Sequence, residues 1–97
     1  MIELAEIEAA RERIAGAAIR TPLVRLPISS GPADIYLKLE NLQPIGSFKI
    51  RGATNAVLLA PASARARGLV TASAGNMAQG VAWAARSLGV PATIAVP

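Results

Sequence analysis

The last thirty residues, 68–97, follow the order strand, loop, helix, turn and strand, and this order constrains the fold more than any other feature. The runs GLVTA (68–72) and ATIAV (92–96) are typical of short strands, and Met77–Leu88 is typical of a helix. Two strands joined through a helix pair in parallel, so the chain is predicted to be an α/β protein. Because a parallel sheet is normally covered on both faces, we expect these 97 residues to be part of a larger fold.

The first sixty residues predict two more helices with extended segments between them. Ile2–Ala18 carries apolar residues at approximately helical spacing, and Ser47 is placed as the N-cap of a helix over Phe48–Ala60. Between these helices, extended runs are predicted at Leu23–Leu26 and Ile35–Glu40, and turns at Ser29–Pro32 and Gln43–Gly46.

The composition excludes several kinds of chemistry. The chain has no cysteine and no histidine, so disulfides, thiolate metal sites and histidine-based triads are excluded, and no metal site is predicted. The acidic, amphipathic start MIELAEIEAARER is unlike a secretory signal, and no apolar run reaches the roughly 20 residues that cross a membrane. A cytoplasmic protein is therefore expected. The hydrophobic content of 53% fits either an alanine-rich coding bias or faces that are covered in a larger protein.

The net charge of +4 is unevenly distributed. All six acidic residues lie among the first forty, and only cations follow Asn41. Nucleic-acid binding is disfavoured, because these cations are scattered and the single Phe, Tyr and Trp lie far apart. A small anionic ligand, or acidic neighbours elsewhere in a longer chain, explains the excess equally well.

Lys49, in the run SFKIRG, is the first candidate for chemistry. Its ordinary explanation is a solvated lysine on a helix. However, a cation in the first helical turn opposes the helix dipole by roughly 0.3–1 kcal/mol. Phe48 and Ile50 flank it and Arg51 follows closely. Burial and nearby positive charge both disfavour the ammonium form, so this lysine is a candidate activated amine of the kind that forms Schiff bases with carbonyl compounds.

The stretch TASAGNMAQG (71–80) is the second candidate. Small residues between a strand and a helix leave backbone N–H groups pointing outward at the positive helix end, which favours anion binding. Simpler roles are an N-cap for Asn76 and a turn contact for Ser73. Gly75 and Gly80 predict special backbone angles or a close approach. No P-loop lysine and no GxGxxG motif is present, so a nucleotide site is not predicted.

Three segments together resemble the serine/threonine dehydratases, which are fold-type II enzymes dependent on pyridoxal 5′-phosphate and close relatives of the serine racemases. The segments are ARERIAGAAIRTPLVRL, LKLENLQPIGSFKIRGATNA and GLVTASAGNMAQGVAWAARSLGVPATIAVP. The resemblance covers nearly the whole chain but only the N-terminal part of the family pattern. It implies open, twisted, mainly parallel sheets flanked by helices, as in the tryptophan synthase β subunit. Residues 1–67 would begin the large cofactor domain, and residues 68–97 would begin the small domain.

The same resemblance implies a role for each candidate residue. Lys49 would carry the cofactor as a Schiff base, Phe48 would pack on its pyridine ring, and Asn76 would hydrogen-bond its phenolic oxygen. A pocket for the substrate carboxylate, formed partly by backbone amides, would be lined by Ser73, Ala74, Gly75, Asn76 and Met77.

Details of the two motifs favour the dehydratase branch. The chain has SFKIRG where threonine synthases usually have SFKDRG, and SAGN where cysteine synthases usually have TSGN. Ala74 stands where serine racemases carry the serine that serves as their second acid/base, so elimination is favoured over racemisation. Met77 departs from the histidine that is most common in the family, which puts the loop's polar contacts and the substrate preference in doubt.

The resemblance therefore implies a lyase that converts L-threonine or L-serine to a 2-oxo acid and ammonia. The alternatives are serine racemase, another β-eliminating relative, or a non-catalytic α/β fragment. The expected partners are an amino-acid substrate and either further copies of the chain or a missing C-terminal portion, with no nucleic acid or membrane. The 97 residues alone are expected to be inactive, because they contain no glycine-rich run resembling the family's phosphate cradle.

Overall fold

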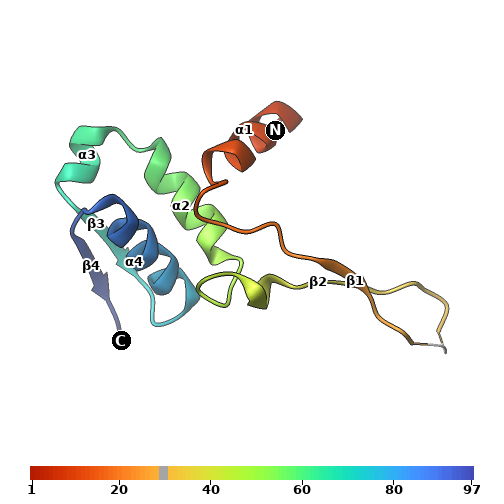
Figure 1. The fold of residues 1–97 in the computed structure, drawn as a ribbon. Coiled ribbons are helices and arrows are strands. Elements are labelled where there is room, and N and C mark those ends of the chain that lie inside the picture. The colour runs from red at the N-terminus through yellow and green to blue at the C-terminus, as the bar shows by residue number, and fades with distance from the viewer. Residues whose placement is uncertain (29–30) are drawn as a thin grey trace.

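The computed structural model describes residues 1–28 and 31–97 (Figure 1). Of the predicted turn Ser29–Pro32, Ser29 and Ser30 lie outside the described residues. The elements follow in the order α1 (Leu4–Arg13), β1 (Leu23–Arg25), β2 (Tyr36–Lys38), the short 3-10 helix η1 (Glu40–Leu42), α2 (Lys49–Leu59), α3 (Ala62–Ala66), β3 (Leu69–Ala72), α4 (Asn76–Leu88) and β4 (Ala92–Ala95).

The predicted βαβ unit is confirmed. Strands β3 and β4 pair in parallel, from Leu69 opposite Ala92 to Ala72 opposite Ala95, and α4 connects them. Gly89 ends α4 in the left-handed conformation, with φ 64°, where a residue without Cβ avoids a steric penalty. This cap turns the chain sharply from the helix into β4.

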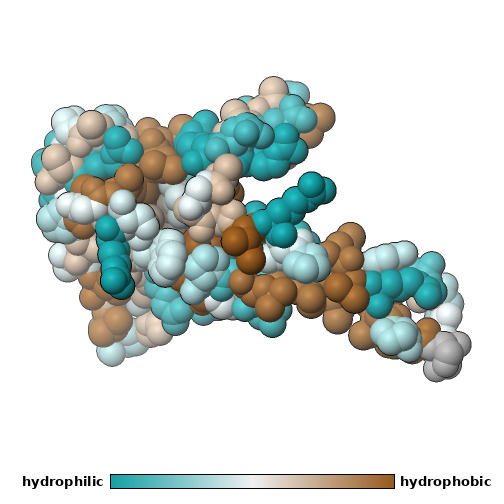
Figure 2. Space-filling model, viewed as in Figure 1, coloured by the Kyte–Doolittle hydropathy of each residue, from teal (hydrophilic) through white to brown (hydrophobic). Residues whose placement is uncertain are grey.

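The two predicted extended runs form a narrow antiparallel hairpin. Leu23 pairs with Lys38 and Arg25 with Tyr36, and every residue of both strands is exposed. The hairpin extends away from the helices in Figure 1, and Figure 2 shows hydrophobic side chains along it. Its large apolar residues therefore lie uncovered within the part of the chain that the structure describes.

The first helix is shorter than its hydrophobic spacing predicts. It ends at Arg13 rather than Ala18, and residues 14–17 form turns in which the Ile14 carbonyl accepts the amides of Ala17 and Ala18. None of the α1 residues is buried, whereas Ile14 and Ala18 pack with Ile50 in a core cluster. The apolar residues of this segment therefore enter the core after the helix has ended.

Helices α2 and α4 pack side by side and run in the same direction. Gly80, one turn into α4, lies against Lys49 and Ala53 in the first turn of α2. Further along, Thr54 and Leu58 of α2 line the same small cavity as Ala84 and Leu88 of α4. The starts of the two helices are therefore neighbours, and the buried Ala53, Val57, Ala84 and Ala85 lie along the two helices. Among the described residues, no helix combines the length and the apolar character that crossing a membrane would require.

Candidate active site

Lys49 is the first residue of α2, and its two large apolar neighbours point in different directions. Ile50 is 0% exposed and belongs to the core, whereas Phe48 is 56% exposed. Lys49 itself is half-buried. The predicted sandwich of a lysine between two buried apolar side chains is therefore wrong: one neighbour anchors the helix, and the other lies on the surface beside the amine.

The Lys49 amine lies over the face of Phe48, with Nζ 4.5 Å from the ring centroid. Within the described residues it makes no ion pair or hydrogen bond. The Lys49 backbone N–H donates to Ser47 Oγ over 3.3 Å, but the N-cap position belongs to Phe48, whose backbone is already helical. Ser47 thus supports the start of the helix, one position earlier than predicted.

The charge of Arg51 does not stand unpaired beside the lysine, in contrast to the expectation from the sequence. Its guanidinium contacts both oxygens of Glu40, with Nε 2.9 Å from Oε2 and a terminal nitrogen 2.8 Å from Oε1. The same terminal nitrogen donates to the Ile19 carbonyl over 2.9 Å. Because Glu40 compensates the guanidinium charge, repulsion from Arg51 is not what would activate Lys49.

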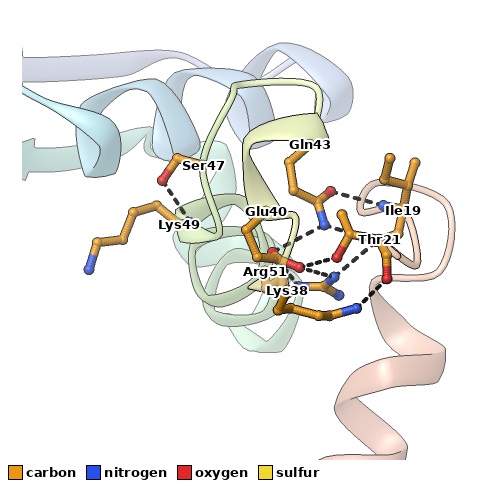
Figure 3. A network of polar contacts seen from close by, with 8 residues as sticks. All are labelled: Ile19, Thr21, Lys38, Glu40, Gln43, Ser47, Lys49 and Arg51. Carbon is orange, nitrogen blue, oxygen red and sulfur yellow. Dashed lines mark hydrogen bonds and ion pairs between the residues drawn. The ribbon is translucent and has the colours of Figure 1, made fainter. Parts of the chain in front are cut away.

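A network of polar contacts continues from this ion pair to the chain that follows α1 (Figure 3). Thr21 donates its hydroxyl to Glu40, and the Gln43 amide donates to Glu40 over 3.2 Å. The hydrogen bond from Arg51 is the main reason why the pKa of Glu40 falls to about 2, and this carboxylate in turn raises the pKa of Arg51. Glu40 is therefore ionised throughout the physiological pH range.

The loop between β3 and α4 is held by backbone contacts at both ends. The Ser73 N–H donates to the Ala95 carbonyl over 3.0 Å, and Ser73 Oγ accepts the Gly75 N–H over 3.2 Å. The N-cap of α4 is Gly75 rather than Asn76, which is the first helical residue. Asn76 has no cap bond to make, so its exposed side chain is available to a ligand.

The first intrahelical bond of α4 runs from the Gln79 N–H to the Gly75 carbonyl over 3.3 Å. The amides before Gln79 therefore have no partner within the helix, as is general for helix starts, and they lie at its positive end. Ala74, Asn76 and Met77 are exposed at this end. The predicted anion-seeking character of the loop thus has a structural basis.

Of the two glycines predicted to be special, Gly80 is and Gly75 is not. A Cβ on Gly80 would lie 3.0 Å from the Ala53 Cβ and 3.2 Å from the Lys49 carbonyl oxygen. At Gly75, φ is −135° and a Cβ would meet nothing within 4 Å. The Gly80 contact brings the Lys49 end of α2 and the 73–77 end of α4 together, so all the sequence-predicted site residues lie at neighbouring helix starts.

Sequence reasoning missed Glu40, Gln43 and Thr21, which organise the base of α2. Their spacing has no helical or strand period that would predict a meeting with Arg51. A signal was nevertheless present, because Glu40 is the last acidic residue before a wholly cationic remainder of the chain. It is the acidic side chain nearest in sequence to Lys49 and Arg51.

Comparison with known proteins identifies the class. The family model described as "Pyridoxal-phosphate dependent enzyme" matches residues 14–97, which is most of the chain. The chain therefore belongs to this family, whose cofactor is pyridoxal phosphate. The fold agrees with fold-type II members of the family, as the sequence predicted.

Individual relatives narrow the comparison. The chain is 48% identical to the L-threonine ammonia-lyase of Thermotoga maritima, with all of the chain matching 25% of that protein. It is 44% identical to a catabolic L-threonine dehydratase of Staphylococcus aureus, again over its full length and 29% of the relative. Among solved structures, maize serine racemase matches with a TM-score of 0.91 and 36% identity over 98% of this chain and 30% of that one. A bacterial threonine deaminase, from "T.th.", matches with a TM-score of 0.82 and 43% identity, over 96% and 33% respectively. The chain thus spans a quarter to a third of the length of these relatives.

The residues present fit the family's cofactor. A primary amine with no acidic partner among the described residues stands beside an exposed aromatic ring, and the unpaired amides at the start of α4 lie next to it. These groups can bind an aldehyde, stack on a ring and attract an anion, respectively.

Proposed function

We propose that the protein carrying this chain is a pyridoxal-phosphate-dependent ammonia-lyase that converts L-threonine or L-serine to a 2-oxo acid and ammonia. The observation that carries this proposal is the packing of Gly80 on the Lys49 carbonyl, because it sets an unpaired amine beside an anion-seeking loop. The names of the similar proteins, L-threonine ammonia-lyase and L-threonine dehydratase, support elimination as the reaction.

In this proposal the chain supplies three functions at one end of α2 and α4. Lys49 binds the cofactor covalently, and its amine, once free, takes the proton from Cα of the substrate. Phe48 packs on the cofactor ring, and Asn76 hydrogen-bonds the cofactor's phenolic oxygen. When bound, pyridoxal phosphate supplies an electron sink that makes the Cα proton acidic.

The loop from Ser73 to Met77 binds the substrate carboxylate. The amides before Gln79 donate to its oxygens at the positive end of α4, which also fixes the orientation of Cα. Ser73 Oγ is already engaged with the Gly75 N–H, so Ser73 shapes the loop as well as lining it. Loss of the β-hydroxyl as water, followed by hydrolysis, then releases the 2-oxo acid and ammonia.

Chemical trapping tests the assignment of Lys49. The complete gene product, loaded with pyridoxal phosphate, is reduced with borohydride and mapped by peptide mass spectrometry. We expect the adduct on Lys49. Lys38, the other lysine of this chain, is the internal control, since its Nζ donates to the Thr21 carbonyl. An adduct on Lys38, or no adduct in this chain, would contradict the proposal.

Racemisation is the second candidate, because maize serine racemase has the TM-score of 0.91. The fold cannot separate the two activities, whereas residue 74 can. Ala74 has no proton to exchange, so L-serine is expected to give pyruvate and ammonia with D-serine as a minor product. Ala74→Ser is expected to raise the D-serine share, and a wild-type protein that makes more D-serine than pyruvate would overturn the choice.

We further propose that residues 1–67 belong to a large cofactor domain and 68–97 to a small one, and that the protein assembles as an oligomer. Exposed large apolar residues support burial by other segments or copies: Val70 is 81% exposed and Leu23 is 64% exposed. Light scattering of the complete gene product tests the assembly, and a monomer at micromolar concentration would contradict it.

A further inference from the structure

The first turn of α2 carries Lys49 and Arg51 on opposite sides. Two residues along an α-helix correspond to a rotation of roughly 200°, so the two side chains project away from each other. Ile50, between them, is fully buried in the core cluster. Rotation of this turn about the helix axis would therefore move the Lys49 amine and the Arg51 guanidinium together, in opposite directions.

The Arg51 side of the turn is held by several directional contacts. The guanidinium makes two hydrogen bonds to Glu40 and one to the Ile19 carbonyl. Gln43, which is 4% exposed, binds the same backbone unit at both ends: its Oε1 accepts the Ile19 N–H over 3.0 Å, and its Nε2 donates to the Ile19 carbonyl over 2.8 Å. The plane of the guanidinium is thus fixed against both a carboxylate and the main chain (Figure 3).

The Lys49 side of the turn has far fewer constraints. Its amine has no ion pair or hydrogen bond within the described residues, and its backbone N–H has one contact, with Ser47 Oγ. Gly80 packs on its carbonyl. Nothing described that touches the Lys49 side chain from outside α2 and Phe48 determines its direction, so the direction comes from the orientation of the turn itself.

We propose that Glu40, Gln43 and Arg51 form a positioning cluster that directs the Lys49 amine by fixing the rotation of the first turn of α2. This inference rests on the proposed function of Lys49. The cluster does not touch the reacting atoms, so its members are positioning residues. A displacement of about 1 Å at a reacting group can cost about 100-fold in rate, so a small rotation of the turn suffices for a large effect.

The test uses the complete gene product with Arg51→Lys, which keeps the charge but loses the planar fork, and Glu40→Gln, which keeps the shape but loses the charge. Asp34→Asn is the matched control, because it breaks an arginine–carboxylate pair in the hairpin that does not reach α2. Each folded variant is measured for kcat and KM with L-threonine, for visible circular dichroism of bound pyridoxal phosphate, and for amide hydrogen exchange of residues 49–54 without cofactor.

We expect kcat to fall about 10- to 100-fold in Arg51→Lys and Glu40→Gln, with KM within about twofold of wild type. The visible dichroism should change, and residues 49–54 should exchange faster, while Asp34→Asn remains native in all three readouts. Variants that lose only thermal stability but keep native kcat and dichroism would overturn the proposal. Should Arg51→Lys fail to fold, Glu40→Gln carries the test.

The exchange measurement separates this proposal from the assignment of Lys49. If trapping places the cofactor elsewhere, the proposed function fails, but faster exchange of residues 49–54 still supports control of the turn by the cluster. If trapping finds Lys49 and exchange is unchanged, the positioning cluster alone is refuted.

Discussion

The base of α2 and the β1–β2 hairpin each contain an arginine–carboxylate pair, and the two pairs have different surroundings. Arg51 and Glu40 have side chains that are 33% and 18% exposed, and the pair is bonded to Thr21, Gln43 and the Ile19 backbone. In the hairpin, the side chains of Arg25 and Asp34 are 59% and 61% exposed. Solvent screening makes such an exposed pair worth about 0–1 kcal/mol, whereas a shielded pair within a network contributes more.

The difference shows where this chain depends on directional contacts. The hairpin has no buried residue in either strand, so its charged groups hold nothing in place. The base of α2 joins a polar cluster, a core residue and the candidate reactive amine within three consecutive positions. Substitutions of the same chemical kind should therefore have large effects at the base of α2 and small effects in the hairpin.

The largest contrast is expected between the two lysines. Lys49→Ala should lower turnover of the complete gene product by at least about 1000-fold, because it removes both the covalent attachment and the proton-accepting amine. Lys38→Ala, in β2 of the hairpin, should stay within a few-fold of wild type. Steady-state kinetics with L-threonine and the visible spectrum of bound cofactor measure both. A Lys49→Ala enzyme that retained turnover would remove the functional side of the comparison.

The next contrast is between two glycines near the base of α2. Gly80→Ala places a Cβ 3.0 Å from the Ala53 Cβ and 3.2 Å from the Lys49 carbonyl, so we expect a loss of about 1–3 kcal/mol in stability from overpacking. Gly52→Ala meets nothing within 4 Å inside α2 and should stabilise by about 0.5–1 kcal/mol. Denaturant unfolding measures both changes, and equal effects at the two positions would contradict the close contact.

The two acids give a smaller contrast. Glu40→Gln should destabilise by roughly 1–3 kcal/mol, because it leaves a partly shielded guanidinium without its carboxylate. Asp34→Asn should change stability by less than about 1 kcal/mol. Chemical unfolding at neutral pH provides the comparison, and a cost for Asp34→Asn as large as for Glu40→Gln would show that exposure is not the deciding factor.

The pH dependence sharpens the same comparison. The pKa of Glu40 is lowered from 4.5 to about 2 in the folded protein, so its contribution to stability is complete above about pH 4.5. It is lost as the pH falls from there towards about 2. Thermal unfolding between pH 5 and 3 should therefore show a shallower acid-induced decrease in Glu40→Gln than in wild type. Parallel curves would mean that the contact with Arg51 does not lower the pKa of Glu40.

Much of the fold could be predicted because it depends on local patterns. The alternating runs and the small-residue turns predict β3, α4 and β4 to within about two residues, and Gly89 is a helix stop that depends on one backbone angle. The end of α1 was not predictable in this way. Apolar spacing continues to Ala18, but Ile14 and Ala18 are buried through turns rather than through a continuous helix.

The candidate site was predictable in its residues but not in its surroundings. The motif around Lys49 and the loop 73–77 are contiguous in sequence, so each could be found directly. The partner of Arg51 could not, since Glu40 is eleven positions away and is brought close only by the path through η1. A charge that looks unpaired in a sequence is for this reason weak support for an activated neighbour.

The contact at Gly80 limits how this region can be redesigned. One of the two atoms that a methyl group would meet is the Ala53 Cβ, and exchanging the residues, as Ala53→Gly with Gly80→Ala, would relieve that half of the crowding. The other atom is the carbonyl oxygen of residue 49, which is present whatever side chain that position carries. An engineer who moved the reactive amine to another position on α2 would therefore still need glycine at position 80, because the requirement comes from the main chain.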